Sequence, residues 1–253
     1  MELKLIDAHA HLQFPQFDAD RGQVIERARE AEMGVINVGT DLATSREAVK
    51  LAETYPNMWA TVGLHPIDID QKFDEATFLK LANHKKVIAI GECGLDYFHI
   101  KDSEERKKQI EIFERQIDLA QKVNKTLMIH CRNAYQELLN ILENYSALKF
   151  NLHFFAGNWE MAKRFLDLDC TLSFTGVVTF TNQYDEVIKN MPLDRLLVET
   201  DCPFVAPVPH RGKRNEPIYV EMVAKRVAVI RGLAAEEVAA AAKLNTERQF
   251  ALF

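Results

Sequence analysis

The sequence lacks several features that would place a protein outside the cell interior. No apolar run reaches the roughly 18 to 20 residues that cross a membrane, and the opening Met-Glu-Leu-Lys lacks the apolar core of a signal peptide. Only four cysteines occur in 253 residues, with no CxxC pair among Cys93, Cys131, Cys170 and Cys202. This spacing excludes a disulfide scaffold and favours reduced thiols that pack as small apolar side chains. We therefore expect a cytoplasmic protein with no membrane partner.

An excess of basic residues is also missing. The chain has 31 Lys and Arg against 37 Asp and Glu, which gives a formal net charge of -6. Proteins that coat duplex DNA need clustered Lys and Arg to neutralise many phosphates, so this charge argues against that mode of binding. Contact with a few phosphates in a pocket stays open. No Pro-, Gly- or Ser-rich linker interrupts the chain, and we expect one domain over residues 1–253.

Short β-branched or apolar runs alternate with longer amphipathic segments along the chain. This alternation is typical of parallel strands joined by right-handed helical crossovers. The runs predict strands at Leu3–Asp7, Val35–Gly39, Trp59–Gly63, Val87–Gly91, Thr126–Cys131, Phe150–Phe154, Cys170–Phe174 and Arg195–Glu199.

The amphipathic segments predict helices. Thr44 or Ser45 marks the start of the second helix, and Asp102 or Ser103 marks the start of the fourth. The alanine-rich segment 234–242 contains strong helix formers, and we expect it to cover the outer ring. The predicted helices are Gly22–Glu32, Ser45–Thr54, Glu75–Ala82, Glu104–Val123, Ala134–Asn144, Trp159–Asp167, Asp185–Lys189, Pro217–Arg231 and Ala235–Ala251.

Eight strand-helix units predict an α/β fold, a closed (β/α)8 TIM barrel of the metal-dependent hydrolase type. An open doubly wound sheet has the same alternation and is the main competing fold.

Polar residues with ligand chemistry follow the ends of the predicted strands, the end at which a barrel carries its active site. His9 and His11 lie two residues apart, so an extended strand points both imidazoles the same way. Barrel closure brings strand 8, and with it Asp201, next to strand 1. The ends of strands 4, 5 and 6 carry a second group, Glu92, His130 and His153.

The two oxygens of Glu92 can bridge the two groups, which predicts a binuclear metal centre. Imidazole and carboxylate without thiolate suit Zn²⁺, Mn²⁺, Fe²⁺ or Co²⁺, and Mg²⁺ stays open. We expect Glu92 and Asp201 to be the catalytic residues, with Asp201 positioned to accept a proton from water. No organic cofactor is expected. The predicted metal ligands are His9, His11, Glu92, His130, His153 and Asp201.

Other residues are candidates for substrate contact. Arg132 follows His130 by two positions and shares its face, and His65 can hydrogen-bond the scissile group instead of binding metal. Arg211 lies in a basic loop after strand 8, where barrels often bind phosphate. His84 and His99 fall in predicted surface segments and are left out. The aromatic residues that could stack a nucleobase are Tyr97, Phe98, Phe154 and Phe155.

Five segments form an ordered set of motifs, Ile6–Leu12, Val62–Pro66, Ile90–Tyr97, Ile129–Arg132 and Glu199–Pro203. They resemble, in this order, the motifs of the TatD family of metal-dependent deoxyribonucleases. The chain departs from the family pattern at Phe154, where Cys or Ser is usual, and at Asn133, where Asp is common. Neither departure removes a ligand, but both change the surroundings that tune metals and substrate.

The resemblance implies an amidohydrolase-like TIM barrel, two divalent metal ions and phosphodiester hydrolysis with 3′-to-5′ exonuclease action. It also implies that His9, His11, Glu92 and Asp201 hold one ion, and that Glu92, His130 and His153 hold the other.

The leading hypothesis is a divalent-metal-dependent deoxyribonuclease that acts on single-stranded DNA or DNA ends, with two Zn, Mg or Mn ions per chain. The alternative is a hydrolase with the same two metals that cleaves small esters, lactones, amides or phosphoesters. A third reading is a metal-storing or scaffolding protein. It is disfavoured because structural zinc sites close all four positions, mostly with thiolates.

Overall fold

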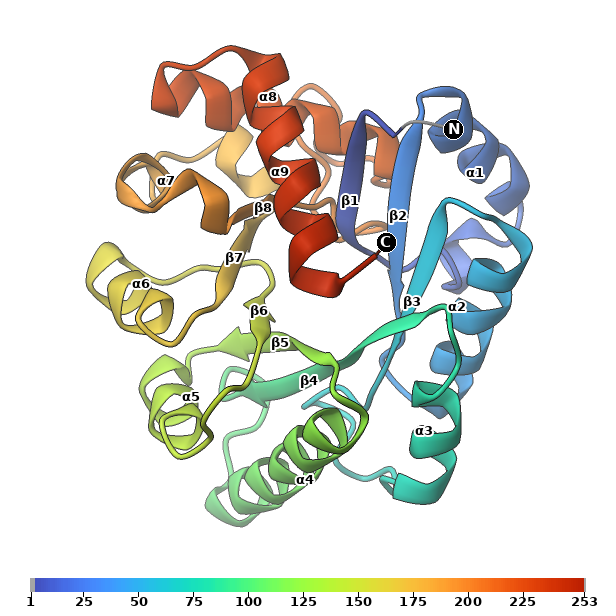
Figure 1. The fold of residues 1–253 in the computed structure, drawn as a ribbon, viewed down its shortest axis with the longest axis vertical. Coiled ribbons are helices and arrows are strands. Elements are labelled where there is room, and N and C mark those ends of the chain that lie inside the picture. The colour runs from blue at the N-terminus through green and yellow to red at the C-terminus, as the bar shows by residue number, and fades with distance from the viewer. Residues whose placement is uncertain (1–2, 253) are drawn as a thin grey trace.

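The strands form one parallel sheet whose order follows the sequence from β1 to β8 (Figure 1). The computed structural model describes residues 3–252, so positions 1, 2 and 253 of the expected single domain lie outside the described residues. The (β/α)8 barrel is confirmed. The strands are β1 (Leu5–Ala10), β2 (Met33–Val38), β3 (Met58–Val62), β4 (Val87–Asp96), β5 (Thr126–Arg132), β6 (Phe150–Leu152), β7 (Thr171–Phe174) and β8 (Leu196–Val198).

Backbone and side-chain hydrogen bonds close the sheet between β1 and the segment after β8. The backbone N–H of His11 donates to the carbonyl of Cys202 at 2.8 Å. The fully buried carboxylate of Asp7 accepts from the backbone N–H of Thr200 at 2.8 Å and from its hydroxyl at 2.5 Å. These contacts join the first and last strands, so the competing open sheet is wrong.

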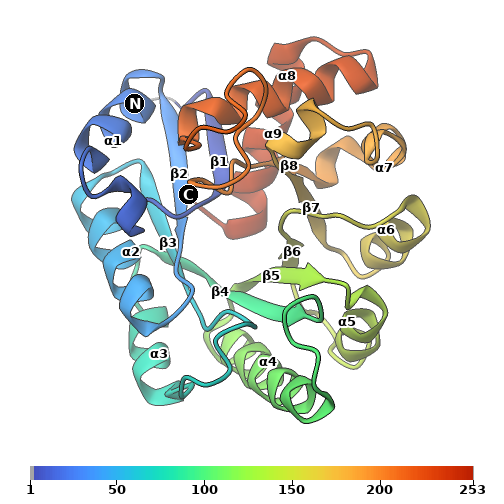
Figure 2. The ribbon, with the colours of Figure 1, turned by 180° about the vertical axis from the view of Figure 1, so that it is seen from behind.

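Helices surround the barrel on its outside, as Figures 1 and 2 show from opposite ends. Short 3-10 turns lie at Pro15–Phe17, Gly176–Thr179, Leu193–Arg195 and Pro217–Tyr219. The α-helices are α1 (Arg21–Glu30), α2 (Leu42–Thr54), α3 (Glu75–Ala82), α4 (Ser103–Val123), α5 (Tyr135–Leu142), α6 (Trp159–Leu166), α7 (Asp185–Asn190), α8 (Val220–Arg231) and α9 (Ala235–Phe250).

The second helix begins earlier than the sequence predicted. Asp41 caps α2, and its carboxylate accepts from the backbone N–H of Thr44 at 2.7 Å, while the Thr44 hydroxyl accepts from the N–H of Asp41 at 2.9 Å. Thr44 is therefore the returning partner of a capping box and not the cap itself. At α4 the expected Asp102 cap is confirmed, because its carboxylate accepts from the N–H groups of Glu104 and Glu105.

Strand β4 continues past its expected end at Gly91 and stops at Asp96. Gly91 allows this because its φ of +147° suits glycine, and a Cβ atom there would lie 2.3 Å from the carbonyl oxygen of Met128. Glu92 therefore lies within a strand, buried next to β5. The ends of β6 and β8 fall at Leu152 and Val198, so the polar residues that follow them lie in the loops at the barrel mouth.

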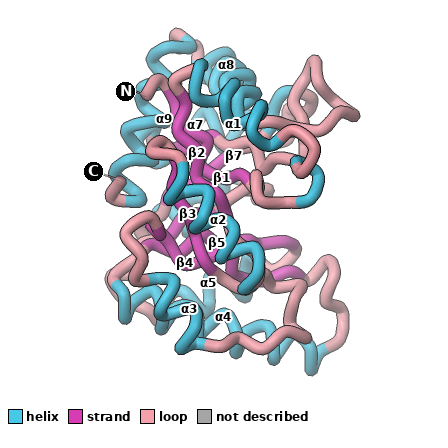
Figure 3. The backbone as a smooth tube through the Cα atoms, turned by 90° about the vertical axis from the view of Figure 1, so that its right-hand side faces the viewer, coloured by secondary structure: helices cyan, strands magenta, loops and turns pink. Residues whose placement is uncertain are grey.

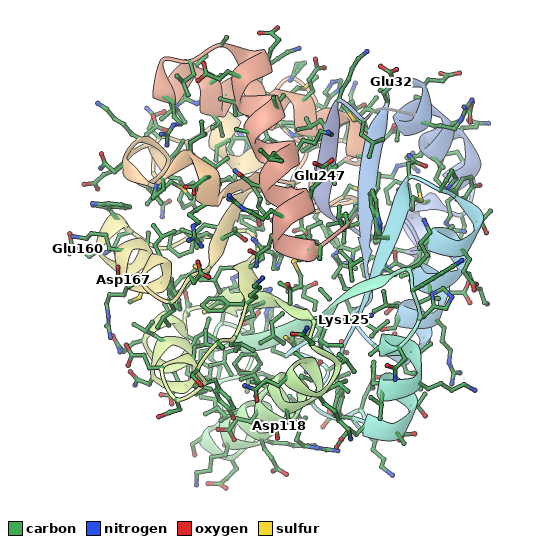
Figure 4. The ribbon with its side chains drawn as sticks, in the orientation of Figure 1. Glu32, Asp118, Lys125, Glu160, Asp167 and Glu247 are labelled. Carbon is green, nitrogen blue, oxygen red and sulfur yellow. The ribbon has the colours of Figure 1, made fainter. Side chains whose placement is uncertain are left out.

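Helix α9 covers the N-terminal end of the barrel, which differs from the expected place in the outer ring. The carbonyl of Gln249 accepts from the hydroxyl of Thr126, the first residue of β5, at 2.8 Å. In Figure 3 this helix and the chain end lie at one end of the strands, and long loops lie at the other. Figure 4 shows Glu247 of α9 and Lys125 on this same face. Phe250 belongs to one buried apolar cluster of the barrel interior, whose other members include Ile6, Ala8, Val38, Trp59, Met128 and Leu197.

All four cysteines are buried and free, which confirms their expected role as packed thiols. Within residues 3–252, no helix combines the length and apolar character needed to traverse a bilayer.

Replacing Phe250 by Ala opens a cavity in the barrel floor. Phe250 is 2% exposed, so we expect Phe250→Ala to lower the free energy of unfolding by about 3 kcal/mol. Urea unfolding monitored by circular dichroism measures this change. The control Val229→Ala, at a side chain 71% exposed, should change stability by less than about 0.5 kcal/mol. Equal stabilities of the two variants would contradict the assigned role of α9.

Candidate metal centre

A cavity of about 650 Å³ opens at the C-terminal ends of the strands. Figure 2 views this end of the molecule, where the loops after β1 and β8 lie in front. Five of the six predicted ligands line the cavity, and His9 lies fully buried behind them. The lining residues from the predicted site are His11, His65, Glu92, His130, Arg132, His153 and Asp201.

The carboxylate of Glu92 lies between two groups of imidazoles. Its Oε2 atom is 3.3 Å from Nε2 of His9 and 3.7 Å from Nε2 of His11. Its Oε1 atom is 2.9 Å from Nε2 of His153 and 3.2 Å from Nδ1 of His130. Each oxygen thus faces one of the two groups that the sequence predicted.

Asp201 joins the first group, as barrel closure predicted. Its Oδ1 atom lies 3.4 Å from Nε2 of His11 and 3.8 Å from Nε2 of His9. The backbone N–H of Asp201 donates to the carbonyl of His9 at 2.9 Å, which fixes the carboxylate next to the end of β1.

Hydrogen bonds at the far ring nitrogens orient two of the imidazoles. Nδ1 of His11 is 2.8 Å from the carbonyl oxygen of Val38, so it carries the proton and leaves the Nε2 lone pair free. Nε2 of His130 is 3.1 Å from Oδ2 of Asp96, so its Nδ1 lone pair is free. Both free lone pairs are on the side of Glu92. The two rings are therefore held as metal ligands are held.

Asp96 and Glu199 are residues that the sequence reasoning missed. The buried carboxylate of Asp96 also lies 2.8 Å from Nδ1 of His99, which is exposed as the sequence predicted and does not line the cavity. Oε1 of Glu199 lies 3.4 Å from Nδ1 of His153 and accepts from the backbone N–H of Phe154 at 2.7 Å. Asp96 follows a predicted strand and Glu199 ends one, and both lie within the quoted motifs, which was the available signal.

The ring of His65 differs from those of His11 and His130 in which nitrogen carries the proton: the nitrogen that faces Glu92 is protonated. Its Nδ1 accepts from the backbone N–H of Ile67 at 3.2 Å, so the ring proton is on Nε2, which lies 3.2 Å from Oε1 of Glu92. A protonated Nε2 can donate to a substrate oxygen. His65, Glu92 and His130 also lie close enough together to hold an ion, so contact of His65 with substrate rather than metal stays a prediction.

The two predicted substrate arginines lie in different places. Arg132 lines the cavity, with its guanidinium carbon 3.8 Å from the centre of the Phe98 ring. Arg211 lies over the ring of Phe180 at 4.0 Å and does not line the cavity, so its contact with substrate stays a prediction. In the same loop, the guanidinium of Arg214 forms an ion pair with the carboxylate of Asp20, the residue before α1, at 2.7 Å.

The electrostatics of the site keep both acids ionised. Burial alone would raise the pKa of Glu92, but the neighbouring imidazoles of His153, His65 and His9 outweigh it and hold that pKa well below the usual value. Burial also acts on Asp201, whose pKa is nevertheless lowered by its hydrogen bond with the first imidazole group. Ionised carboxylates surrounded by imidazole nitrogens attract cations.

The spacing of the donor atoms fits metal ions. Metal–ligand bonds of about 2.0 to 2.2 Å place neighbouring ligand atoms about 3 Å apart. Nε2 of His9 and Nε2 of His11 are 3.1 Å apart, and Nδ1 of His130 and Nε2 of His153 are 3.3 Å apart. Groups of side chains able to hold an ion include His9, His11 and Glu92.

The barrel and this donor set define the class of protein, a TIM-barrel hydrolase that depends on metal ions. Comparison with known proteins gives the family: residues 6–251 match the model of the family described as TatD related DNase, and the chain belongs to that family. It is 42% identical to the uncharacterized metal-dependent hydrolase YabD of Bacillus subtilis, over 97% of this chain and 98% of that protein.

Two further relatives cover the chain from end to end. The protein named 3'-5' ssDNA/RNA exonuclease TatD of Erwinia tasmaniensis is 34% identical over 98% of this chain and 100% of its own length. The crystal structure of YJJV, a TatD homolog from Escherichia coli, superposes with a TM-score of 0.91 at 28% identity, over 99% of both chains.

The hydrogen bond between Asp96 and His130 should be measurable in metal binding. We expect Asp96→Ala to weaken the affinity for Zn²⁺ or Mn²⁺ about 10- to 100-fold, because the imidazole of His130 loses the partner that fixes its tautomer. Isothermal titration calorimetry gives this ratio. Asp70→Ala, at a fully exposed carboxylate, is the control and should bind as wild type does. Unchanged affinity in Asp96→Ala would remove Asp96 from the centre.

Proposed function

We propose that this protein is a two-metal phosphodiesterase that removes nucleotides from the 3′ end of single-stranded DNA. The observation that carries the proposal is the carboxylate of Glu92, whose two oxygens face two separate imidazole groups. Paired ions held about 3.5 to 4 Å apart in this way are typical of nucleases and phosphatases. The proposal includes Zn²⁺, Mn²⁺ or Mg²⁺ as the ions and the cytoplasm as the location.

Three observations support a single-stranded nucleic acid as the substrate. The Erwinia tasmaniensis relative carries that substrate in its name, and the family is described as one of DNases. The chain is acidic, which argues against broad contact with a duplex. The cavity volume of about 650 Å³ falls in the range of small-ligand sites, so it suits a strand end rather than a double helix.

The side chains at the cavity can each take a different role in phosphodiester hydrolysis. Bound metal ions supply an activated water molecule and polarise a phosphoryl oxygen. Asp201 is ionised and lies at the edge of the first imidazole group, where it can accept a proton from water. The Nε2 proton of His65 and the guanidinium of Arg132 both reach the cavity and can stabilise negative charge that develops on the phosphate.

Removal of the bridging carboxylate tests this proposal. With Mn²⁺ or Mg²⁺ and a single-stranded oligonucleotide labelled at its 5′ end, wild type should produce a descending ladder of shorter products. Glu92→Ala should reduce the rate by at least about 100-fold, because ligand loss exceeds the effect of losing a group that only supports a ligand. EDTA should abolish cleavage.

Glu160→Ala is the matched control, because Glu160 is exposed and does not line the cavity. Figure 4 labels this residue on α6. It should cleave at the wild-type rate. Absence of DNA cleavage by metal-loaded wild type, or full activity in Glu92→Ala, would overturn the proposal. Turnover of small phosphoesters or lactones without DNA cleavage would establish the alternative substrate class.

A further inference from the structure

Large apolar side chains are exposed at the mouth of the cavity. Phe204, which follows β8, is 47% exposed and lines the cavity. Phe14, which follows β1, is half-buried and lines it as well. Aromatic rings that line a cavity beside a polar, charged centre point to a ligand that carries a flat apolar surface.

The two rings form a corner next to the first imidazole group. Phe14 stacks on the imidazole of His11, with ring centres 4.5 Å apart and planes 11° from parallel. Phe204 meets Phe14 at 72° with ring centres 6.3 Å apart, and it meets His11 at 66° and 6.4 Å. We define Phe14 and Phe204 as the aromatic corner. A third planar ring can stack on one side of this corner and meet the other edge-on.

Of the four aromatic residues that the sequence singled out, Phe154 lines the cavity, and the other three are placed differently. Phe155 is 1% exposed and cannot stack a base, so that expectation was wrong. Tyr97 is covered by the guanidinium of Arg106, 4.2 Å from its ring centre. Phe98 is exposed but does not line the cavity.

Phe98 instead supports Arg132, which lies against its ring and lines the cavity. Among the described residues, no carboxylate lies within ion-pair distance of the Arg132 guanidinium. Its free N–H groups are therefore available to an anion. Arg132 is the last residue of β5, whereas the aromatic corner follows β1 and β8, so the anion contact and the apolar contact come from different walls.

We propose that the aromatic corner is a nucleobase subsite that accepts an unpaired base of the strand being cleaved. This inference rests on the proposed function and deepens it. In a nucleotide one sugar separates the base from its phosphate, which matches rings that lie directly beside the metal-ligating imidazole of His11. Stacking uses the face that every base has, so the subsite accepts all four bases and excludes bases still stacked in a duplex.

Binding of a cleavage-resistant strand tests the subsite without requiring turnover. The probe is a short single-stranded oligonucleotide with phosphorothioate linkages and the fluorescent base 2-aminopurine at one of the last three positions, in the presence of Mn²⁺. Stacking on the aromatic corner should quench its fluorescence. We expect Phe204→Ala to weaken binding about 5- to 100-fold and to remove the quenching, whereas Phe204→Tyr should keep both.

The controls separate stacking from damage to the fold. Leu244→Ala removes an apolar side chain, 60% exposed, from α9 at the other end of the barrel and should bind as wild type does. An oligonucleotide with an abasic site in place of the stacked base should bind wild type and Phe204→Ala with equal affinity. Without the base, no stacking contact with residue 204 forms in either protein.

The outcomes distinguish this inference from the proposed function. Base-dependent quenching without cleavage of unmodified DNA supports the subsite and removes the nuclease proposal. Normal cleavage of DNA with wild-type affinity and quenching in Phe204→Ala overturns the subsite and leaves the nuclease proposal standing. Failure of wild type to bind the probe, or an equal loss in Phe204→Ala with the abasic strand, also overturns the subsite.

Discussion

The arrangement of this site depends on one shared carboxylate. Glu92 is almost fully buried, and a buried negative charge is tolerable only with compensating partners. The compensation comes from imidazoles on both sides, at 2.9 to 3.7 Å from its oxygens. The nitrogen atoms of those imidazoles lie so close together that their lone pairs are best satisfied by bound cations. The buried charge of Glu92 therefore requires the surrounding imidazoles, and the close spacing of these imidazoles favours bound cations.

The barrel supplies the geometry that this carboxylate needs. Only closure of the sheet places Asp201 beside the end of β1, and the buried Asp7 helps to maintain that closure through its hydrogen bonds with Thr200. The outer nitrogens of His11 and His130 are then held by the carbonyl of Val38 and the carboxylate of Asp96. The ligands lie on rigid strand ends, and their orientation is set by groups one layer farther from the cavity.

The sequence predicted the parts that depend on periodicity and on the ends of strands. Alternation gave the eight strands, and the parallel order then placed His9, Glu92 and His153 at one end without any knowledge of loops. It could not give the orientation of rings, because tautomers depend on long-range contacts such as that of His130 with Asp96. It also missed how Phe155 turns inward and Phe204 outward, since side chains in loops follow no period.

The position of helix α9 has a consequence for how substrate enters and product leaves. Phe250 belongs to the apolar cluster that fills the barrel interior on the side of α9, and the cavity opens at the opposite end of the strands. A product that leaves through the mouth by which substrate enters blocks the next substrate until it departs. Turnover at such a site therefore depends on the rate of product release as well as on the rate of bond cleavage.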